Sequence, residues 1–182
     1  MRQLRLGILL ATAFLLSGIG SMYAQSHEMI VRCVAFYNLE NLFDTIHDEG
    51  KNDYEYLPDG GMKWTSMKYE HKIHNMAYAL SQIGTDEDPR GAACIGVGEV
   101  ENIGCLNDLC EELKKYNRNY QPILLEGPDR RGVDVGFLYN PEMFKPVSVK
   151  GYELKAHYAD GGVVKSRLQL WIAGYMLDDN RK

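Results

Sequence analysis

The segments Phe36-Tyr37-Asn38-Leu39-Glu40-Asn41-Leu42-Phe43-Asp44 and Gly98-Glu99-Val100-Glu101-Asn102 decide the expected fold. Each continues a hydrophobic strand, predicted over residues 31–37 and 92–97, into side chains that carry oxygen atoms. In an α/β protein such strand ends meet at one edge of the sheet, and carboxylates beside a carboxamide suit a hard cation such as Mg²⁺. The pattern therefore favours a metal-assisted reaction on a phosphate ester as the first functional hypothesis.

Hydrophobic periodicity and turn residues predict the order of elements around these two segments. The predicted strands cover residues 31–37, 92–97, 120–125, 133–139, 146–154 and 168–176. One helix begins at Thr65 or Ser66 and ends near Ile83, and a second begins at Asn102 or Asn107 and ends near Tyr116. The order β-α-β-α-β, followed by strands without helices, predicts a mixed-sheet α/β protein.

The N-terminus has the pattern of an export signal. Arg2 and Arg5 precede an apolar run too short to span a membrane comfortably, so residues 1–24 are interpreted as a signal peptide cleaved after Ala24. An uncleaved membrane anchor is the alternative. We expect the mature chain to be periplasmic or extracellular, monomeric and not inserted in a membrane. Signal removal takes the formal net charge from −5 to −7, which argues against a general nucleic-acid coating protein.

The four cysteines are predicted to be mostly buried thiols. Cys33 and Cys94 lie within apolar strands, and Cys105 and Cys110 lie on the second predicted helix. Their spacing matches no zinc site. One disulfide remains a minor alternative in an exported chain.

Three side chains are candidates for holding a metal ion. Asn38 and Glu40 are two positions apart, so on a regular strand they share one face. An asparagine at a strand end is more often a turn residue, but the carboxylate of a neighbouring strand favours a metal role. Glu99 follows a glycine-containing strand, where a carboxylate is costly unless it is paired or metal-bound. Glu101 is better interpreted as an acid that stabilises the start of the following helix.

Residues 129–134 place two arginines at the mouth of a strand. Arginine in such a position can hold a phosphate through two hydrogen bonds, although charges in turns are usually just solvated. Asp134 lies within an otherwise apolar strand and needs a partner, for which Arg130 and Arg131 are the candidates.

Several motifs in matching order resemble the exported bacterial branch of the endonuclease/exonuclease/phosphatase superfamily, which contains deoxyribonuclease I, the apurinic endonucleases and inositol-phosphate phosphatases. They are residues 36–44, Trp64 with Tyr69 and Lys72, residues 98–102 and residues 128–135. The resemblance implies an α/β (α+β) four-layer sandwich, with two mixed β-sheets flanked by helices. It also implies phosphoester hydrolysis that depends on Mg²⁺, with Mn²⁺ as an alternative. Residues 29–182 correspond to the N-terminal part of such a domain, so the sandwich is expected to be incomplete at its C-terminus.

The resemblance also implies roles for particular residues. Asn38 and Glu99 match the metal-site and catalytic residues, Glu40 a further acid near the metal, and Arg131 a catalytic residue that contacts phosphate. Gly136 replaces a common alanine, a difference expected to be harmless. The family's later Asp-x-Asn, Asp and Asp-His motifs are not found in this sequence, so the isolated chain is expected to be inactive.

The sequence therefore favours an exported metal-dependent phosphoester hydrolase, a nuclease or a phosphatase, acting on nucleic acid or a small phosphoester. Two alternatives stay open. One is a non-catalytic exported binding domain on the same scaffold, and the other is a truncated product with no function of its own.

Overall fold

The structure is a computed structural model that describes residues 30–177, and its compact unit begins at Val31. The predicted signal peptide lies outside the described residues. In chain order the elements are β1 (Val34–Leu42), the short 3₁₀-helix η1 (Tyr54–Tyr56), α2 (Ser66–Gln82), β2 (Cys94–Val100), α3 (Ile103–Lys114), β3 (Gln121–Leu124), β4 (Asp134–Tyr139), β5 (Phe144–Tyr152) and β6 (Gln169–Met176). The predicted order of helices and strands is confirmed, and η1 adds one turn to a segment predicted as loop.

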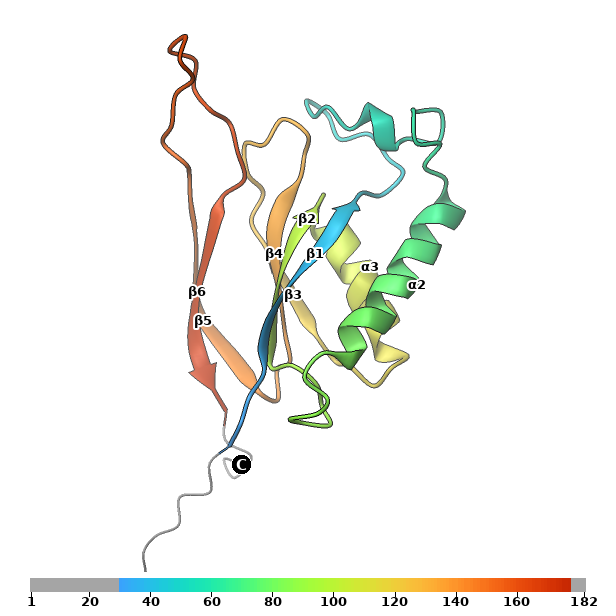
Figure 1. Cartoon of the computed structure of the whole chain (residues 1–182), viewed down its shortest axis with the longest axis vertical. Helices are drawn as coiled ribbons and strands as arrows, with labels where there is room; N and C mark the ends of the chain where they lie inside the picture. The colour runs from blue at the N-terminus through green and yellow to red at the C-terminus, as the bar shows by residue number, and fades with distance from the viewer. Residues whose placement is uncertain (1–29, 178–182) are drawn as a thin grey trace, which may run out of the picture. The chain divides into compact units, whose positions relative to one another are not determined.

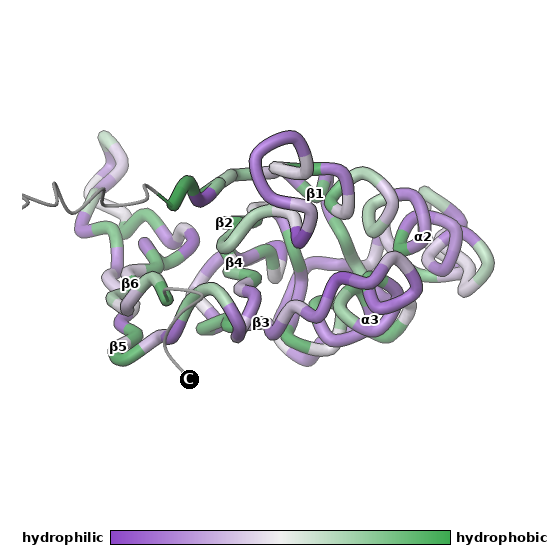
Figure 2. The backbone as a smooth tube through the Cα atoms, turned by 90° about the horizontal axis from the view of Figure 1, so that it is seen from below, coloured by the Kyte–Doolittle hydropathy of each residue, from purple (hydrophilic) through white to green (hydrophobic). Residues whose placement is uncertain are grey.

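Two sheets and two α-helices make up the compact unit. A four-stranded sheet has the order β1-β2-β4-β3, in which β1 and β2 are parallel and the other pairs antiparallel. β5 and β6 form a separate antiparallel pair. Helices α2 and α3 lie on one side of the four-stranded sheet and β5–β6 on the other (Figures 1 and 2). The predicted mixed α/β class with two sheets is confirmed, and within residues 30–177 the helices cover one face of one sheet.

The main core lies between the two helices and the four-stranded sheet. The predicted helix faces are buried there, with Ile73, Ala77 and Leu80 from α2 and Leu106, Leu109, Cys110 and Leu113 from α3. Full burial of one such leucine contributes about 1.5–3 kcal/mol, so this interface fixes the helices on the sheet. Asn102, not Asn107, caps α3, because its side chain accepts a hydrogen bond from the Cys105 backbone N–H at 3.0 Å.

All four cysteines are free thiols, so the predicted thiols are confirmed. Cys94, Cys105 and Cys110 are buried, and burial raises the pKa of each of these thiols to about 12. They act as small apolar side chains rather than as nucleophiles.

The two strands that carry the candidate site run further than predicted. β1 ends at Leu42 rather than Tyr37, and β2 ends at Val100 rather than Val97. Their pairing is interrupted after Asn38 and Gly98 and resumes at Leu42 and Val100, so residues 39–41 lie opposite Glu99 alone. This bulge overturns the assumption of a regular strand on which Asn38 and Glu40 share a face.

Gly136 lies where α3 packs closely on β4. A Cβ at this position would lie 2.5 Å from Leu106 Cδ1 and 3.1 Å from Val97 Cγ2, and both of these side chains are fully buried. The glycine therefore leaves room for α3 to pack closely on β4, and an alanine at this position would require Leu106 to shift.

Neither helix within residues 30–177 combines the length and apolar character that a membrane crossing requires.

Candidate functional site

The candidate metal ligands gather where β1 and β2 end. Asn38 pairs with Gly98, which places Asn38, Glu40 and Glu99 at the carboxyl ends of two neighbouring parallel strands. The Asn38 Oδ1 atom accepts a hydrogen bond from the Glu40 backbone N–H at 2.8 Å. The segments that follow β1, precede β4 and precede β6 all lie at this end of the strands (Figure 1).

The backbone at this end is strained in both strands. Glu40, Asn41 and Glu99 have φ values of 52°, 59° and 61°, a region that side-chain-bearing residues seldom occupy. Each such residue costs on the order of 1–3 kcal/mol and persists only where the surroundings enforce it. Only two other non-glycine residues of the described chain, Lys63 and Asn117, have positive φ. The strain is therefore concentrated at the predicted site, which is where functional constraint would place it.

Lys72 of α2 holds the bulge from the helix side. Its ammonium group donates hydrogen bonds to the backbone carbonyls of Glu40 and of Asn41, the latter at 3.0 Å. It lies 5.5 Å from the ring centroid of Trp64, whose Nε1 donates to the Phe43 carbonyl at 2.9 Å. Burial lowers the pKa of Lys72, while the charges of Glu40 and Glu99 favour its protonated form. Sequence reasoning assigned Lys72 no role, because its partners are main-chain carbonyls.

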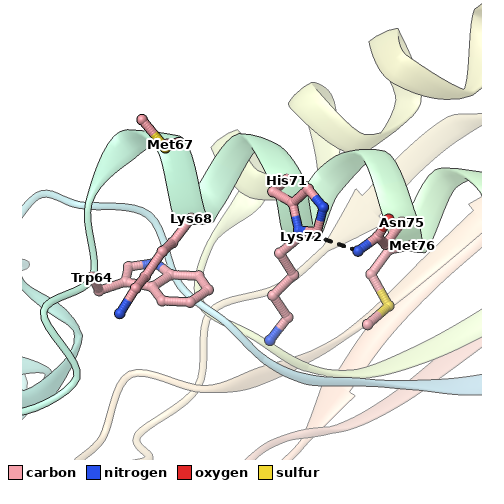
Figure 3. Close-up of a pocket in the computed structure, with 7 residues that line it drawn as sticks. All are labelled: Trp64, Met67, Lys68, His71, Lys72, Asn75 and Met76. Atoms are coloured by element: carbon pink, nitrogen blue, oxygen red, sulfur yellow. Dashed lines mark hydrogen bonds between the residues drawn. The ribbon is translucent and has the colours of Figure 1, made fainter.

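A groove of about 510 Å³ runs along the outer surface of α2 next to this contact. It is lined by Trp64, Met67, Lys68, His71, Lys72, Asn75 and Met76 (Figure 3). No carboxylate lines it, so the groove itself offers no ligand set for a hard cation.

Two arginines lie near the candidate ligands. Arg167, which precedes β6, has its Nη1 3.9 Å from Glu99 Oε1 and its Nε 3.9 Å from Asp129 Oδ2. Arg131 contacts the same Asp129 carboxylate at 3.3 Å from its Nε and remains half exposed. Arg167 could not be identified as a site residue from the sequence, because an isolated arginine before a strand does not indicate a function.

Glu101 is a buried carboxyl group rather than a helix cap. Its side chain is 3% exposed and accepts a hydrogen bond from the Asp44 backbone N–H at 2.7 Å, and burial raises its pKa to about 8. Potential ligand atoms of Asp44, Glu101 and Cys105 lie within 4.8 Å of one another. Because the thiol and this carboxyl both hold their protons, the group is better explained as a link between the end of β1 and α3. The interpretation of Glu101 as a helix-stabilising acid is therefore wrong.

Asp134 also differs from its prediction. Its Oδ1 accepts a hydrogen bond from the Gly127 backbone N–H at 2.9 Å, and neither predicted arginine is its partner. Burial raises the pKa of Asp134. The bond fixes the loop before β4, on which Asp129 and Arg131 lie.

The donor set at the strand ends fits a hard cation. Asn38, Glu40 and Glu99 offer only oxygen atoms, which suit Mg²⁺ or Mn²⁺ better than softer metals. The Glu99 side chain is 22% exposed, and its nearest ion-pair partner, Arg167, stands at 3.9 Å. That distance exceeds a normal hydrogen bond, so carboxylate oxygens of Glu99 remain accessible to a cation.

Comparisons with known proteins give a family and one solved structure. Residues 33–182 match the model of the Endonuclease/Exonuclease/phosphatase family. No curated protein matches the chain. The crystal structure of a functionally unknown conserved protein from Enterococcus faecalis V583 matches with 13% sequence identity and a TM-score of 0.42, over 82% of this chain and 48% of that one. The chain thus spans about half the length of that structure.

Proposed function

The chain belongs to the endonuclease/exonuclease/phosphatase family, and from that premise we propose that it forms the metal- and phosphate-binding part of a divalent-metal-dependent phosphoester hydrolase. The substrate is a nucleic acid or a small phosphoester. We further propose that the chain is exported through residues 1–24 to the periplasm or the cell exterior, and that it acts as a monomer. The acidic composition argues against long duplex nucleic acid as the main ligand.

Each residue of the site has a role in this proposal. Asn38, Glu40 and Glu99 would hold Mg²⁺ or Mn²⁺, which when bound polarises a phosphoryl oxygen and stabilises the charge that develops on attack by water. Arg131 and Arg167 both approach Asp129, and Arg167 also approaches Glu99, so the two arginines would orient the phosphate through paired N–H donors. Lys72 maintains the bulge that presents Glu40.

The single observation that carries the proposal is the strained backbone of Glu40, Asn41 and Glu99. These residues come from two strands that are far apart in sequence and adjacent in the sheet. A fold selected for stability alone would place glycine at such positions. Two of these three residues are carboxylates, Glu40 and Glu99, which supports a need for their side chains.

Three of the four histidines in residues 30–177 pair with side chains other than the candidate ligands, and His157 lies between β5 and β6 in a bridge to Val163. His47 pairs with buried Asp53, His74 with Glu112, and His71 contacts Asn75 on the surface of α2. A positioned acid or base typically contributes about 10²–10⁴ in rate, so the chain alone is proposed to bind metal and phosphate but to hydrolyse slowly. The same observation supports the second candidate function, a non-catalytic binding domain on this scaffold.

The test separates metal binding from hydrolysis. Mg²⁺ and Mn²⁺ are titrated calorimetrically into the purified chain and into Glu99→Gln, with Glu126→Gln as an exposed acidic control. Hydrolysis of bis(4-nitrophenyl) phosphate and 4-nitrophenyl phosphate is then followed with the metal and with EDTA. We expect Glu99→Gln to lose the binding heat and the control to keep it. Equal metal binding by the chain and Glu99→Gln would refute the proposed site, and binding without hydrolysis would favour the second candidate.

A further inference from the structure

A small pocket lies between the bulge and the loops that follow β1 and precede β4. Its volume is about 220 Å³, and it is lined by Asn41, Phe43, Asn52, Glu55, Tyr56 and Arg131. We propose that this pocket binds the hydroxylated ring of a small sugar phosphate and so determines which phosphoester the site accepts. The inference rests on the proposed function, because the phosphate of that ligand would lie next to Arg131 and beside the metal that Glu99 would hold.

The pocket adjoins the candidate metal ligands. Asn41 directly follows Glu40 in the bulge, and Arg131 is the predicted phosphate contact. The charges of Glu99 and Arg131 both act on the Tyr56 hydroxyl. Burial and the negative charge of Glu55, followed by that of Glu99, raise the pKa of Tyr56, and the positive charge of Arg131 opposes them. Asn41, which lines the pocket together with Tyr56, belongs to the bulge that lies opposite Glu99, so a ligand in the pocket lies next to that bulge.

The aromatic wall of the pocket is held in place before any ligand binds. The rings of Phe43 and Tyr56 stack with centroids 4.2 Å apart and an interplanar angle of 8°, and Trp64 packs edge-on against Tyr56 at 6.3 Å. A wall ordered in advance lowers the entropy cost of binding.

The loop that carries Asn52, Glu55 and Tyr56 is fixed at two further points. The Asn52 backbone N–H donates to the Arg130 carbonyl at 2.7 Å, and Lys51 Nζ donates to the carbonyls of Gly127 and Asp129. Asp53 is 1% exposed and accepts from the Asp48 backbone N–H at 2.8 Å while pairing with His47. The hydrogen bonds of Asn52 and Lys51 join the two loops, and those of Asp53 order the first loop. The pocket is therefore formed by fixed contacts within the fold.

The lining favours a neutral, hydroxyl-rich ring over other ligands. Two carboxamides, a carboxylate and a phenol offer donors and acceptors in one small space, which suits hydroxyl groups that both donate and accept. The Tyr56 ring, supported from behind by the buried Phe43 ring, offers an apolar surface to the carbon face of such a ring. An acyl chain would leave the polar groups of the pocket without partners.

Charge argues against a polymer ligand. Glu55 repels any phosphate placed inside the pocket, and Arg131 is its only cationic lining residue. A nucleic-acid strand needs several cations along its backbone. The phosphate of the ligand therefore belongs at the mouth of the pocket, next to Arg131, with the neutral ring inside.

A pair of matched ligands tests the proposal. Glucose 6-phosphate and cyclohexylmethyl phosphate differ in the ring hydroxyls and ring oxygen and share the phosphate, and each is titrated calorimetrically into the chain with Mg²⁺ present. We expect glucose 6-phosphate to bind at least about tenfold more tightly, as one to two net hydrogen bonds would give. Tyr56→Phe, which keeps the ring stack, and Glu55→Gln should each reduce this preference about threefold or more. Tyr54→Phe in the same 3₁₀ turn, outside the pocket, should leave it unchanged.

Equal affinity for the two phosphates would overturn the proposal, as would an equal loss in Tyr54→Phe and Tyr56→Phe. Tighter binding of a short oligothymidylate than of glucose 6-phosphate would overturn it in favour of a nucleic-acid ligand. Hydrolysis of 4-nitrophenyl phosphate reports on the proposed function independently of the ring. A sugar preference without hydrolysis would therefore support the pocket while the hydrolase proposal fails, and hydrolysis without a preference would do the reverse.

Discussion

Replacing Lys72 with methionine is expected to impair the site far more than it impairs the fold. The ammonium group makes hydrogen bonds to two carbonyls and a cation–π contact with Trp64. A hydrogen bond from a charged donor contributes about 1.5–3 kcal/mol, and an exposed cation–π contact about 0.5–1 kcal/mol. Water can replace the ammonium at the exposed Glu40 carbonyl, and each strained residue that relaxes returns about 1–3 kcal/mol.

The net loss in the free energy of unfolding is therefore small, about 1–2 kcal/mol, because relaxation of the bulge offsets most of the lost contacts. For a chain of this size that corresponds to a fall in Tm of about 2–8 °C. The site suffers more, since a shift of about 1 Å in a positioned group can cost on the order of 10² in rate. We expect the Mg²⁺ affinity to fall about tenfold or more, which corresponds to about 1.4 kcal/mol.

The assay measures Tm by circular dichroism and the Mg²⁺ dissociation constant by calorimetry for Lys72→Met. Lys68→Met is the matched control, because Lys68 lies on the same helix, is exposed and donates to the Met62 carbonyl instead. Lys72→Arg should retain part of the metal affinity, because its guanidinium N–H groups can still donate to the carbonyls of the bulge. If Lys72→Met and Lys68→Met have the same metal affinity, Lys72 does not position the site and the reasoning is refuted.

Three further outcomes are expected. Saturating Mg²⁺ should raise the Tm of the chain, because only the folded strand ends bring the ligands together. Both EDTA and the substitution Glu99→Gln should remove that rise in Tm. An unchanged rise in Glu99→Gln would exclude Glu99 as a ligand. Hydrogen bonds from Arg90 lower the pKa of Asp88 to about 2. This carboxylate therefore stabilises the fold at neutral pH by at most about 2 kcal/mol, and the contribution disappears as the pH falls through about 2. The free energy of unfolding of Asp88→Asn should be lower than that of the unchanged chain at pH 7, and the difference should vanish in strong acid. Gly136→Ala should lower the free energy of unfolding by about 1–3 kcal/mol in urea, because the new methyl group must displace Leu106; a change below about 0.5 kcal/mol would show that α3 adjusts freely.

Much of the fold follows from local patterns in the sequence. The stripe of Ile73, Ala77 and Leu80 predicts α2, and a capping asparagine predicts α3, because periodicity and caps depend on neighbouring residues alone. The strand ends are less predictable. Polar residues such as Asn38 and Glu99 usually mark the end of a strand, whereas here a bulge allows the pairing to continue past them.

The sequence suggests candidate residues for the site but does not reveal the contacts that support them. Glu99 and Asn38 carry a local signal, because side chains with oxygen atoms follow two apolar strands that are predicted to be neighbours. Arg167 carries none, because it is an isolated arginine before a strand of the other sheet. The motif that contains Lys72 does not reveal that its ammonium group binds main-chain carbonyls. Glu101 was misassigned because its burial depends on how α3 packs against the end of β1, a tertiary contact that spacing does not reveal.

The left-handed residues at the strand ends have a consequence for protein engineering. Glycine at positions 40, 41 or 99 would adopt the same backbone without strain, so a screen that scores only heat resistance or soluble yield should enrich glycine there. Such variants would be more stable but would lack side chains of the proposed site. Efforts to stabilise this chain should therefore keep these three residues unchanged. In a library without that restriction, enrichment of glycine would identify the positions at which the natural residue lowers stability.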